Sequence, residues 1–267
     1  MSEVRTSIDD EDGRYRAVAE IEVSGTPEQV WELIATGPGV EAWFVPAEVE
    51  PGVGGRYLTR HGDFGDSEGV ITAWEPPHRI AYDEPDWQGP GTEVPTWNTE
   101  IVVEAVSGSI CVVRLSSGFL AGGDAWSDVI VGTFAGWSGA LRNLRLYLTH
   151  FAGLPVTTLW IRHELPLGAP DVITAAGLRE GRVGAPAATA APAPTLSGTL
   201  EQRTDDSVVV RTAEPCPGIA EITTLRHEGT WVVFGWTLYG EDGPEVLDRE
   251  RAAWASWLAG QVTRTGG

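Results

Sequence analysis

The chain has 267 residues, of which 42% are hydrophobic and 12 are tryptophan, enough apolar material for one large or two small packed domains. The chain has 38 acidic residues, 18 arginines and no lysine, so its net charge is −20. Nucleic acids and anionic membranes are therefore poor partners, because both would be repelled. No apolar run approaches the roughly 18–20 residues of a membrane span. No signal peptide is visible and there are only two cysteines, so we predict a reduced, cytoplasmic protein.

The first half predicts one strand, two helices, several strands and a long helix, in that order. Residues 1–16 are predicted to be a frayed acidic tail, and Ala17–Val23 a strand. Thr26-Pro27-Glu28-Gln29 predicts a capped helix start, because Thr26 and Gln29 can form a capping box and proline suits the first helical turn. A second short helix is expected over residues 40–44. Strands are then expected near residues 56–59, 70–74, 79–82, 99–106 and 109–115, and the closing helix over 127–151.

The second half predicts a shorter series of the same kind. A strand over 159–167 and a helix over 171–178 are followed by strands near 198–203, 207–212, 220–227 and 230–239, and by a helix over 244–262. The Ala- and Pro-rich segment 185–194 is expected to be flexible or extended. This segment is either an interdomain linker or a part of the second half. The repeated patterns described next favour the second alternative.

Four short patterns occur twice in the same order. Gly25-Thr26-Pro27 recurs at residues 168–170, and Glu68-Gly69-Val70-Ile71-Thr72 recurs more loosely at 197–201. The strand pair with Glu100 and Gly108 recurs at Glu221 and Gly229, and Trp137 with Leu141 recurs at Trp254 with Leu258. The distance in sequence between the two occurrences of a pattern decreases from each pattern to the next. We therefore predict a duplicated domain whose second copy is shortened by deletions. The predicted fold class is α+β, because runs of consecutive strands are segregated from the helices. The expected boundaries are a tail over 1–16, a domain over 17–154 and a degenerate second domain over 155–267.

The first copy resembles the activators of the heat-shock chaperone ATPase (AHSA-type proteins) of the START-related, SRPBCC or Bet v-like superfamily. The resemblance covers residues 17–151. The matching residues are Thr26–Trp31, Ala42-Trp43-Phe44, Gly54-Gly55-Arg56-Tyr57, Gly69-Val70-Ile71, Glu75–Ile80, Ser117-Gly118-Phe119, and Gly136-Trp137 with Leu141 and Leu144. The resemblance implies a helix-grip fold, a curved antiparallel sheet around a long carboxy-terminal helix, with a cavity between the two. The second copy lacks the Gly-Gly-aromatic strand and the Trp-Phe pair.

In this superfamily the segments that hold most of the aromatic residues of copy one line the cavity. The expected ligand-binding residues are Trp43, Phe44, Arg56, Tyr57, Trp74, Tyr82, Trp97, Phe119, Trp126, Phe134, Trp137 and Leu141. His61, Asn98 and Glu100 are further candidates for the few polar groups that such pockets place among apolar walls. The alternative is that the aromatic residues only fill the core, which is their usual role.

Other chemistry has little support in the sequence. The five histidines are scattered without metal-ligand spacing, no nucleophile elbow occurs, and Gly52-Val53-Gly54-Gly55 lacks the lysine of a phosphate loop. The acidic residues Asp83, Glu84 and Asp86 could supply acid–base groups, although exposed strand ends are the ordinary explanation. No cofactor, metal or catalytic residue is predicted.

Three functions stay open. The favoured one is binding, without chemistry, of a hydrophobic or aromatic small molecule in the first domain. The second is a co-chaperone or interaction module with a basic partner, because residues 1–154 hold 24 acids against 9 arginines, net −15. The third is a cyclase-like or hydrolase-like enzyme with a buried Tyr, His or Arg in the same cavity, which requires a polar group with a perturbed pKa in the cavity wall.

Overall fold

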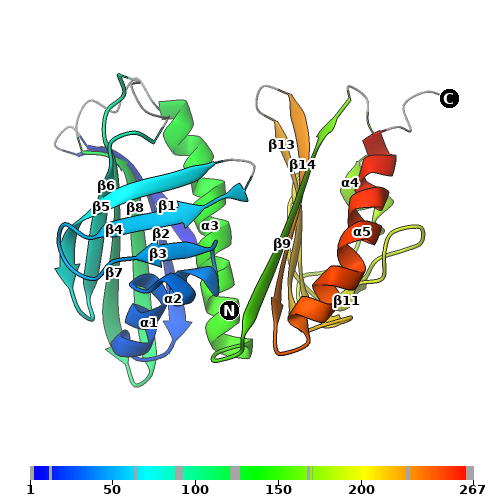
Figure 1. Ribbon diagram of the computed structural model, residues 1–267, viewed down its shortest axis with the longest axis horizontal. Coiled ribbons are helices and arrows are strands. Elements are labelled where there is room, and N and C mark those ends of the chain that lie inside the picture. The colour runs from blue at the N-terminus through cyan, green and yellow to red at the C-terminus, as the bar shows by residue number, and fades with distance from the viewer. Residues whose placement is uncertain are drawn as a thin grey trace. The chain divides into compact units, whose positions relative to one another are not determined.

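The computed structural model describes residues 3–11, 14–62, 65–87, 93–120, 127–166, 169, 171–226 and 229–262. The chain divides into two compact units, residues 1–152 (unit 1) and residues 153–267 (unit 2). Each unit has one antiparallel sheet and one long carboxy-terminal helix, as Figure 1 shows.

Unit 1 is an eight-stranded sheet with three helices. Its strand order is β1-β2-β8-β7-β6-β5-β4-β3, and α3 contacts β1, β2 and β8. The elements are β1 (Arg5–Asp9), β2 (Tyr15–Ser24), α1 (Pro27–Ile34), α2 (Gly37–Glu41), β3 (Ala47–Val49), β4 (Arg56–Arg60), β5 (Asp66–Glu75), β6 (Arg79–Glu84), β7 (Trp97–Ser107), β8 (Ile110–Phe119) and α3 (Ser127–His150).

Unit 2 repeats this connectivity with fewer strands. Its order is β10-β11-β12-β13-β14-β9, and α5 contacts β9 and β14. The elements are β9 (Val156–Leu165), α4 (Val172–Ala175), β10 (Pro186–Ala188), β11 (Ser197–Arg203), β12 (Ser207–Glu214), β13 (Gly218–Arg226), β14 (Thr230–Tyr239) and α5 (Gly243–Val262). In both sheets the first long strand pairs with the last strand, and the remaining strands follow in reverse order. The prediction of two tandem α+β helix-grip copies, the second reduced, is confirmed.

The start of α1 forms as its sequence predicts. The Thr26 hydroxyl accepts a hydrogen bond from the Gln29 backbone N–H, and the Gln29 side chain accepts one from the Thr26 N–H at 2.9 Å. This capping box satisfies donors that the first turn of a helix leaves unpaired.

Two expectations about irregular segments need correction. Residues 5–9 of the predicted frayed tail form β1, which pairs with β2 throughout. Ion pairs across the two strands, Arg5 with Glu20 and Arg16 with Asp9, hold charged residues of both strands in place. In the Ala- and Pro-rich segment, Pro186–Ala188 form β10 on β11, where we had expected the corresponding strand to be lost. A short edge strand tolerates proline because one of its sides needs no partner.

Helix α4 is shorter than the predicted 171–178. Gly177 has φ +76°, its N–H bonds the carbonyl of Thr174, and the N–H of Leu178 bonds the carbonyl of Ile173 at 3.0 Å. This pair of bonds is the Schellman ending of a helix, for which glycine is the favoured residue. A Cβ at Gly177 would also lie 2.6 Å from the Ala190 side chain, so the chain turns here and packs on the following segment.

Candidate functional site

Unit 1 contains a cavity of about 340 Å³. This volume lies at the lower end of the range for small-molecule sites. Strands β4 to β7, helix α3 and the connections after α2, β4 and β6 supply the wall. The lining residues are Phe44, Thr59, His61, Ser67, Tyr82, Glu84, Trp87, Trp97, Val129, Thr133, Gly136 and Trp137.

One part of the wall is aromatic. The Phe44 ring centroid lies 5.1 Å from that of Trp137, and the Trp87 and Trp97 centroids are 5.2 Å apart. The Trp97 indole nitrogen donates to Ser117 Oγ at 2.7 Å, which fixes the ring orientation. These rings offer broad apolar faces of the kind that hold planar ligands.

The other part of the wall is polar and lies on three adjacent strands. Thr59 of β4 and Ser67 of β5 are direct partners in the strand register. Thr59 Oγ1 lies 3.0 Å from His61 Nε2, and the Ser67 hydroxyl donates to Glu84 Oε1. Cross-strand partners have Cβ atoms about 5 Å apart. The two hydrogen-bonded pairs therefore make one polar cluster of four residues on the cavity wall.

Gly69 makes room for this cluster. A Cβ at Gly69 would lie 2.9 Å from Tyr82 Cδ2 and 3.0 Å from Glu84 Cγ. Tyr57 of β4 is the register partner of Gly69. The Tyr57 ring stacks on the Tyr82 ring, with the centroids 4.1 Å apart and an angle of 9° between the ring planes. The glycine thus lets the two tyrosines and Glu84 pack closely against β5.

The ionisable groups of the wall are perturbed by burial. Burial raises the pKa of Glu84, the hydrogen bond from Ser67 opposes this shift, and the charge of Asp83 adds to it. Burial lowers the pKa of His61, partly offset by Asp66, which favours the neutral imidazole. Burial also raises the pKa of Tyr82 well above its usual value, so the phenol is neutral near pH 7.

The structure brings together some of the residues that we expected from the sequence. Phe44, Tyr82, Trp97, Trp137 and the polar candidate His61 line the cavity.

The other candidates lie elsewhere in the core or at the surface. Trp43, Tyr57, Phe119 and Leu141 are buried without lining the cavity, and Phe134 is partly buried against the Trp97 and Phe119 cluster. Trp74 packs on Trp31 with centroids 5.0 Å apart. Trp126 lies outside the described residues.

The polar candidates Arg56, Asn98 and Glu100 do not line the cavity. Arg56 forms ion pairs with Glu48 and Glu68. It points away from the interior because its neighbour Tyr57 points inward, and side chains alternate along a strand. Asn98 bonds Asp83 at 2.8 Å, and Glu100 accepts from Arg79 at 2.7 Å.

Several lining residues were not among the sequence candidates. They are Thr59, Ser67, Glu84, Trp87, Val129, Thr133 and Gly136. A period of two along a strand would have found the most important one, because it places Glu84 on the same face as Tyr82. We had named Glu84 as a possible acid–base group but preferred to explain it as an exposed strand-end acid, and that preference is wrong, because Glu84 is half-buried in the cavity wall.

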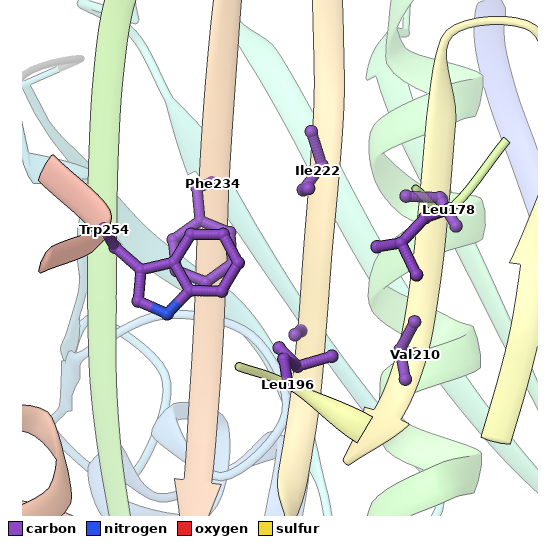
Figure 2. Close-up of a pocket in the computed structure, with 8 residues that line it drawn as sticks. Leu178, Leu196, Val210, Ile222, Phe234 and Trp254 are labelled. Atoms are coloured by element: carbon purple, nitrogen blue, oxygen red, sulfur yellow. The ribbon is translucent and has the colours of Figure 1, made fainter. Parts of the chain in front are cut away.

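Unit 2 has a much smaller pocket at the corresponding place. The pocket between its sheet and helices has a volume of about 10 Å³. Figure 2 shows the Phe234 and Trp254 rings overlapping beside Ile222, Leu196, Val210 and Leu178. The two ring centroids are 4.1 Å apart and nearly parallel. This core is filled by its own side chains.

Neither a metal site nor a membrane-spanning helix is found among the described residues. No three His, Cys, Asp or Glu side chains within the described part of the chain converge as metal ligands would. None of the described helices is both long and apolar enough to cross a membrane.

The fold of unit 1 and its cavity define a helix-grip domain of the SRPBCC class. Residues 24–149 match the family described as activator of Hsp90 ATPase homolog 1-like protein. The first domain is therefore AHSA-type, which confirms the resemblance in the sequence. A search of curated proteins gives no match.

Solved structures with a similar fold include single-domain and longer proteins. DynU16, described as a putative protein in the dynemicin biosynthetic locus, is 16% identical over 92% of this chain and 96% of its own, with a TM-score of 0.44. BexL, described as a di-domain ARO/CYC from the BE-7585A biosynthetic pathway, is 17% identical over 93% and 96%, with a TM-score of 0.43. The Aha1 dimer from Colwellia psychrerythraea is 16% identical over 52% and 98%, with a TM-score of 0.42.

Proposed function

We propose that unit 1 binds a hydrophobic or aromatic small molecule in its cavity and performs no chemistry on it. The observation that carries the proposal is the contrast between two copies of one fold in the same chain. The pocket of unit 1 has about 340 Å³ of open space, whereas the pocket between the sheet and helices of unit 2 has about 10 Å³. Protein interiors are normally packed with few voids, so a cavity of this size with aromatic walls indicates space kept for a ligand.

Gly136 offers a direct way to block the cavity. It lines the cavity from α3, and a Cβ at this position would meet no atom within 4 Å. Gly136→Phe should place a ring in the open space and weaken binding of any cavity ligand by about tenfold or more, which is about 1.4 kcal/mol. Fluorescence titration and native mass spectrometry with two- and three-ring aromatic compounds, neutral, cationic and anionic, measure this.

Gly260 provides the matched control. It lies in α5 of unit 2, and a Cβ there would also meet no atom within 4 Å. Gly260→Phe makes the same helical substitution away from the cavity and should leave the affinity unchanged. Equal affinities for both variants, or no binding by the wild-type protein to any compound of the panel, would contradict the proposal.

An enzyme that uses the same cavity is the second candidate. Its supporting observation is that the wall carries three ionisable groups with shifted pKa values, His61, Tyr82 and Glu84, and such groups are typical of acid–base catalysis. A screen of aryl esters and of cyclisable polyketones tests it. Turnover that both His61→Ala and Glu84→Gln abolish would support catalysis, and no turnover of any compound would count against it.

The family description also keeps a co-chaperone role open. Residues 24–149 match a family described by an Hsp90 ATPase activator, and the surrounding residues 1–154 are strongly acidic. Binding of purified Hsp90 to the immobilised chain at low and high salt tests this role. An interaction through exposed charge should weaken with salt, and no retention at low salt would remove this candidate.

A further inference from the structure

Glu84 is a carboxyl group in a cavity wall that holds no cationic side chain. The described lining residues include no arginine, and no ion pair to Glu84 is found within the described part of the chain. The neighbouring strands β5 and β7 contain no arginine, and the arginines of β4 and of β6 itself pair with other acids. Arg56 and Arg60 of β4 pair with Glu48, and Arg79 of β6 pairs with Glu75 and Glu100.

The groups around Glu84 do not supply the missing positive charge. Ser67 from β5 donates a neutral hydrogen bond to it, and Asp83 beside it on β6 is negative. Tyr57 and Tyr82 are phenols whose ionisation the Glu84 charge opposes. His61, at the end of β4, has a pKa lowered by burial, which disfavours the imidazolium form. The residues that α3 contributes to the wall, Val129, Thr133, Gly136 and Trp137, are uncharged.

The same cavity presents aromatic faces. Phe44, Trp87, Trp97 and Trp137 all line it. The face of an aromatic ring is negative, and tryptophan attracts cations most strongly, with more effect where water is excluded. A carboxylate and several ring faces around one apolar space form an environment that favours an organic cation over a neutral or anionic molecule.

We propose that the ligand of this cavity carries a protonated amine, whose ammonium group binds Glu84 while its hydrocarbon body packs on the aromatic rings. This inference rests on the proposed binding function and names the ligand class. It accounts for a half-buried acid without a counter-ion, because the bound ammonium would supply the charge that the protein lacks. The Ser67 hydroxyl and Gly69 then have the role of orienting the carboxylate and leaving room for it.

Three compounds of similar size test the charge requirement on the full chain. We expect 1-naphthylmethylamine to bind about tenfold or more tightly than 1-naphthalenemethanol at about pH 8, because a hydrogen bond between an ammonium and a carboxylate is stronger than one from a neutral hydroxyl. The anion of 1-naphthoic acid should bind more weakly than either. Isothermal titration calorimetry gives the three affinities.

Substitution of one acid at a time separates a local contact from the general field of an acidic protein. Glu84→Gln keeps the shape and an acceptor for Ser67 but removes the charge, and it should bring the amine to within about twofold of the alcohol. Glu104→Gln is the matched control, because Glu104 is an exposed residue of β7 outside the cavity, and its substitution changes the net charge equally. It should leave the preference for the amine intact.

The pH dependence of the wild-type protein gives an independent readout if Glu84→Gln folds poorly. The preference for the amine should fall as the pH decreases through the raised pKa of Glu84, because protonation removes the carboxylate charge. Protonation of His61 would also reduce the preference for the amine, because it adds a positive charge to the cavity wall. In His61→Gln, the pH dependence that remains should therefore be the part caused by Glu84.

The outcomes distinguish the two levels of the proposal. Equal binding of amine and alcohol, or a preference that Glu84→Gln and Glu104→Gln reduce equally, would overturn the inference and leave the binding function standing. No binding of any of the three compounds, nor of the wider panel, would overturn both.

Discussion

At the residue scale, Glu84 is the position where stability and function oppose each other. Its pKa is raised by burial, so folding disfavours its charged form. A carboxyl whose pKa is raised on folding contributes its stability below the unfolded-state pKa and loses it as the pH rises through the folded-state pKa. A wild-type acid that costs stability near neutral pH is typical of a site kept for binding.

This linkage predicts the effect of removing the charge. Glu84→Gln should raise the Tm at about pH 8 by roughly 2–4 °C, the shift that about 1 kcal/mol gives in domains of 150–250 residues. The two proteins should melt at nearly the same temperature at about pH 4, where Glu84 is protonated. Thermal melts followed by circular dichroism measure this. A lower Tm for Glu84→Gln at about pH 8, with no difference at about pH 4, would show that the charge stabilises the fold.

At the element scale, helices α3 and α5 are equivalent in the repeat but pack differently. Trp254 of α5 is fully buried and stacks on Phe234 at 4.1 Å. The equivalent Trp137 of α3 is half-buried and borders open space. The same residue type therefore fills the core of one unit and lines the cavity of the other.

A pair of substitutions tests this difference. Trp254→Ala should cost about 3–5 kcal/mol, because it leaves a void in a filled core. Trp137→Ala should cost less, about 1–2 kcal/mol, because one side of the ring already faces the cavity. Neither indole nitrogen has a hydrogen-bond partner in the described residues, so packing alone is lost. Urea unfolding measures both losses, and equal losses would mean that Trp137 is packed like Trp254.

At the scale of the whole molecule, the two units differ in the pocket between sheet and helix, which has about 340 Å³ in unit 1 and about 10 Å³ in unit 2. Ligand binding should therefore protect the units unequally. At about 100 times the Kd, a ligand adds about 2.7 kcal/mol to the stability of the state that binds it. Hydrogen exchange followed by mass spectrometry should slow in β4 to β7 with the best ligand of the panel. The backbone amides of β12 to β14 should exchange at an unchanged rate. If the ligand instead slowed exchange only in β12 to β14, the binding site would lie in unit 2.

The order of elements followed from local signals in the sequence. The capping box at Thr26, the strand pairs around Gly108 and Gly229, and the apolar spacing of residues 134–148 depend on neighbours within a few positions, and the structure has these elements. Strands β1, β3 and β10 were missed, because their sequences have no clear strand pattern and they form by pairing with β2, β4 and β11.

The sequence by itself determined that the chain is a doubled α+β fold, because periodicity, caps and repeated patterns act over short distances. It did not determine which aromatic side chains fill space and which border it, since that depends on residues up to about ninety positions apart meeting in one wall. Only the tertiary structure joined Thr59 and His61 to Ser67 and Glu84 and left the acid without a cation beside it. The charge of this cavity, and the ligand class that we infer from it, are set by packing across strands.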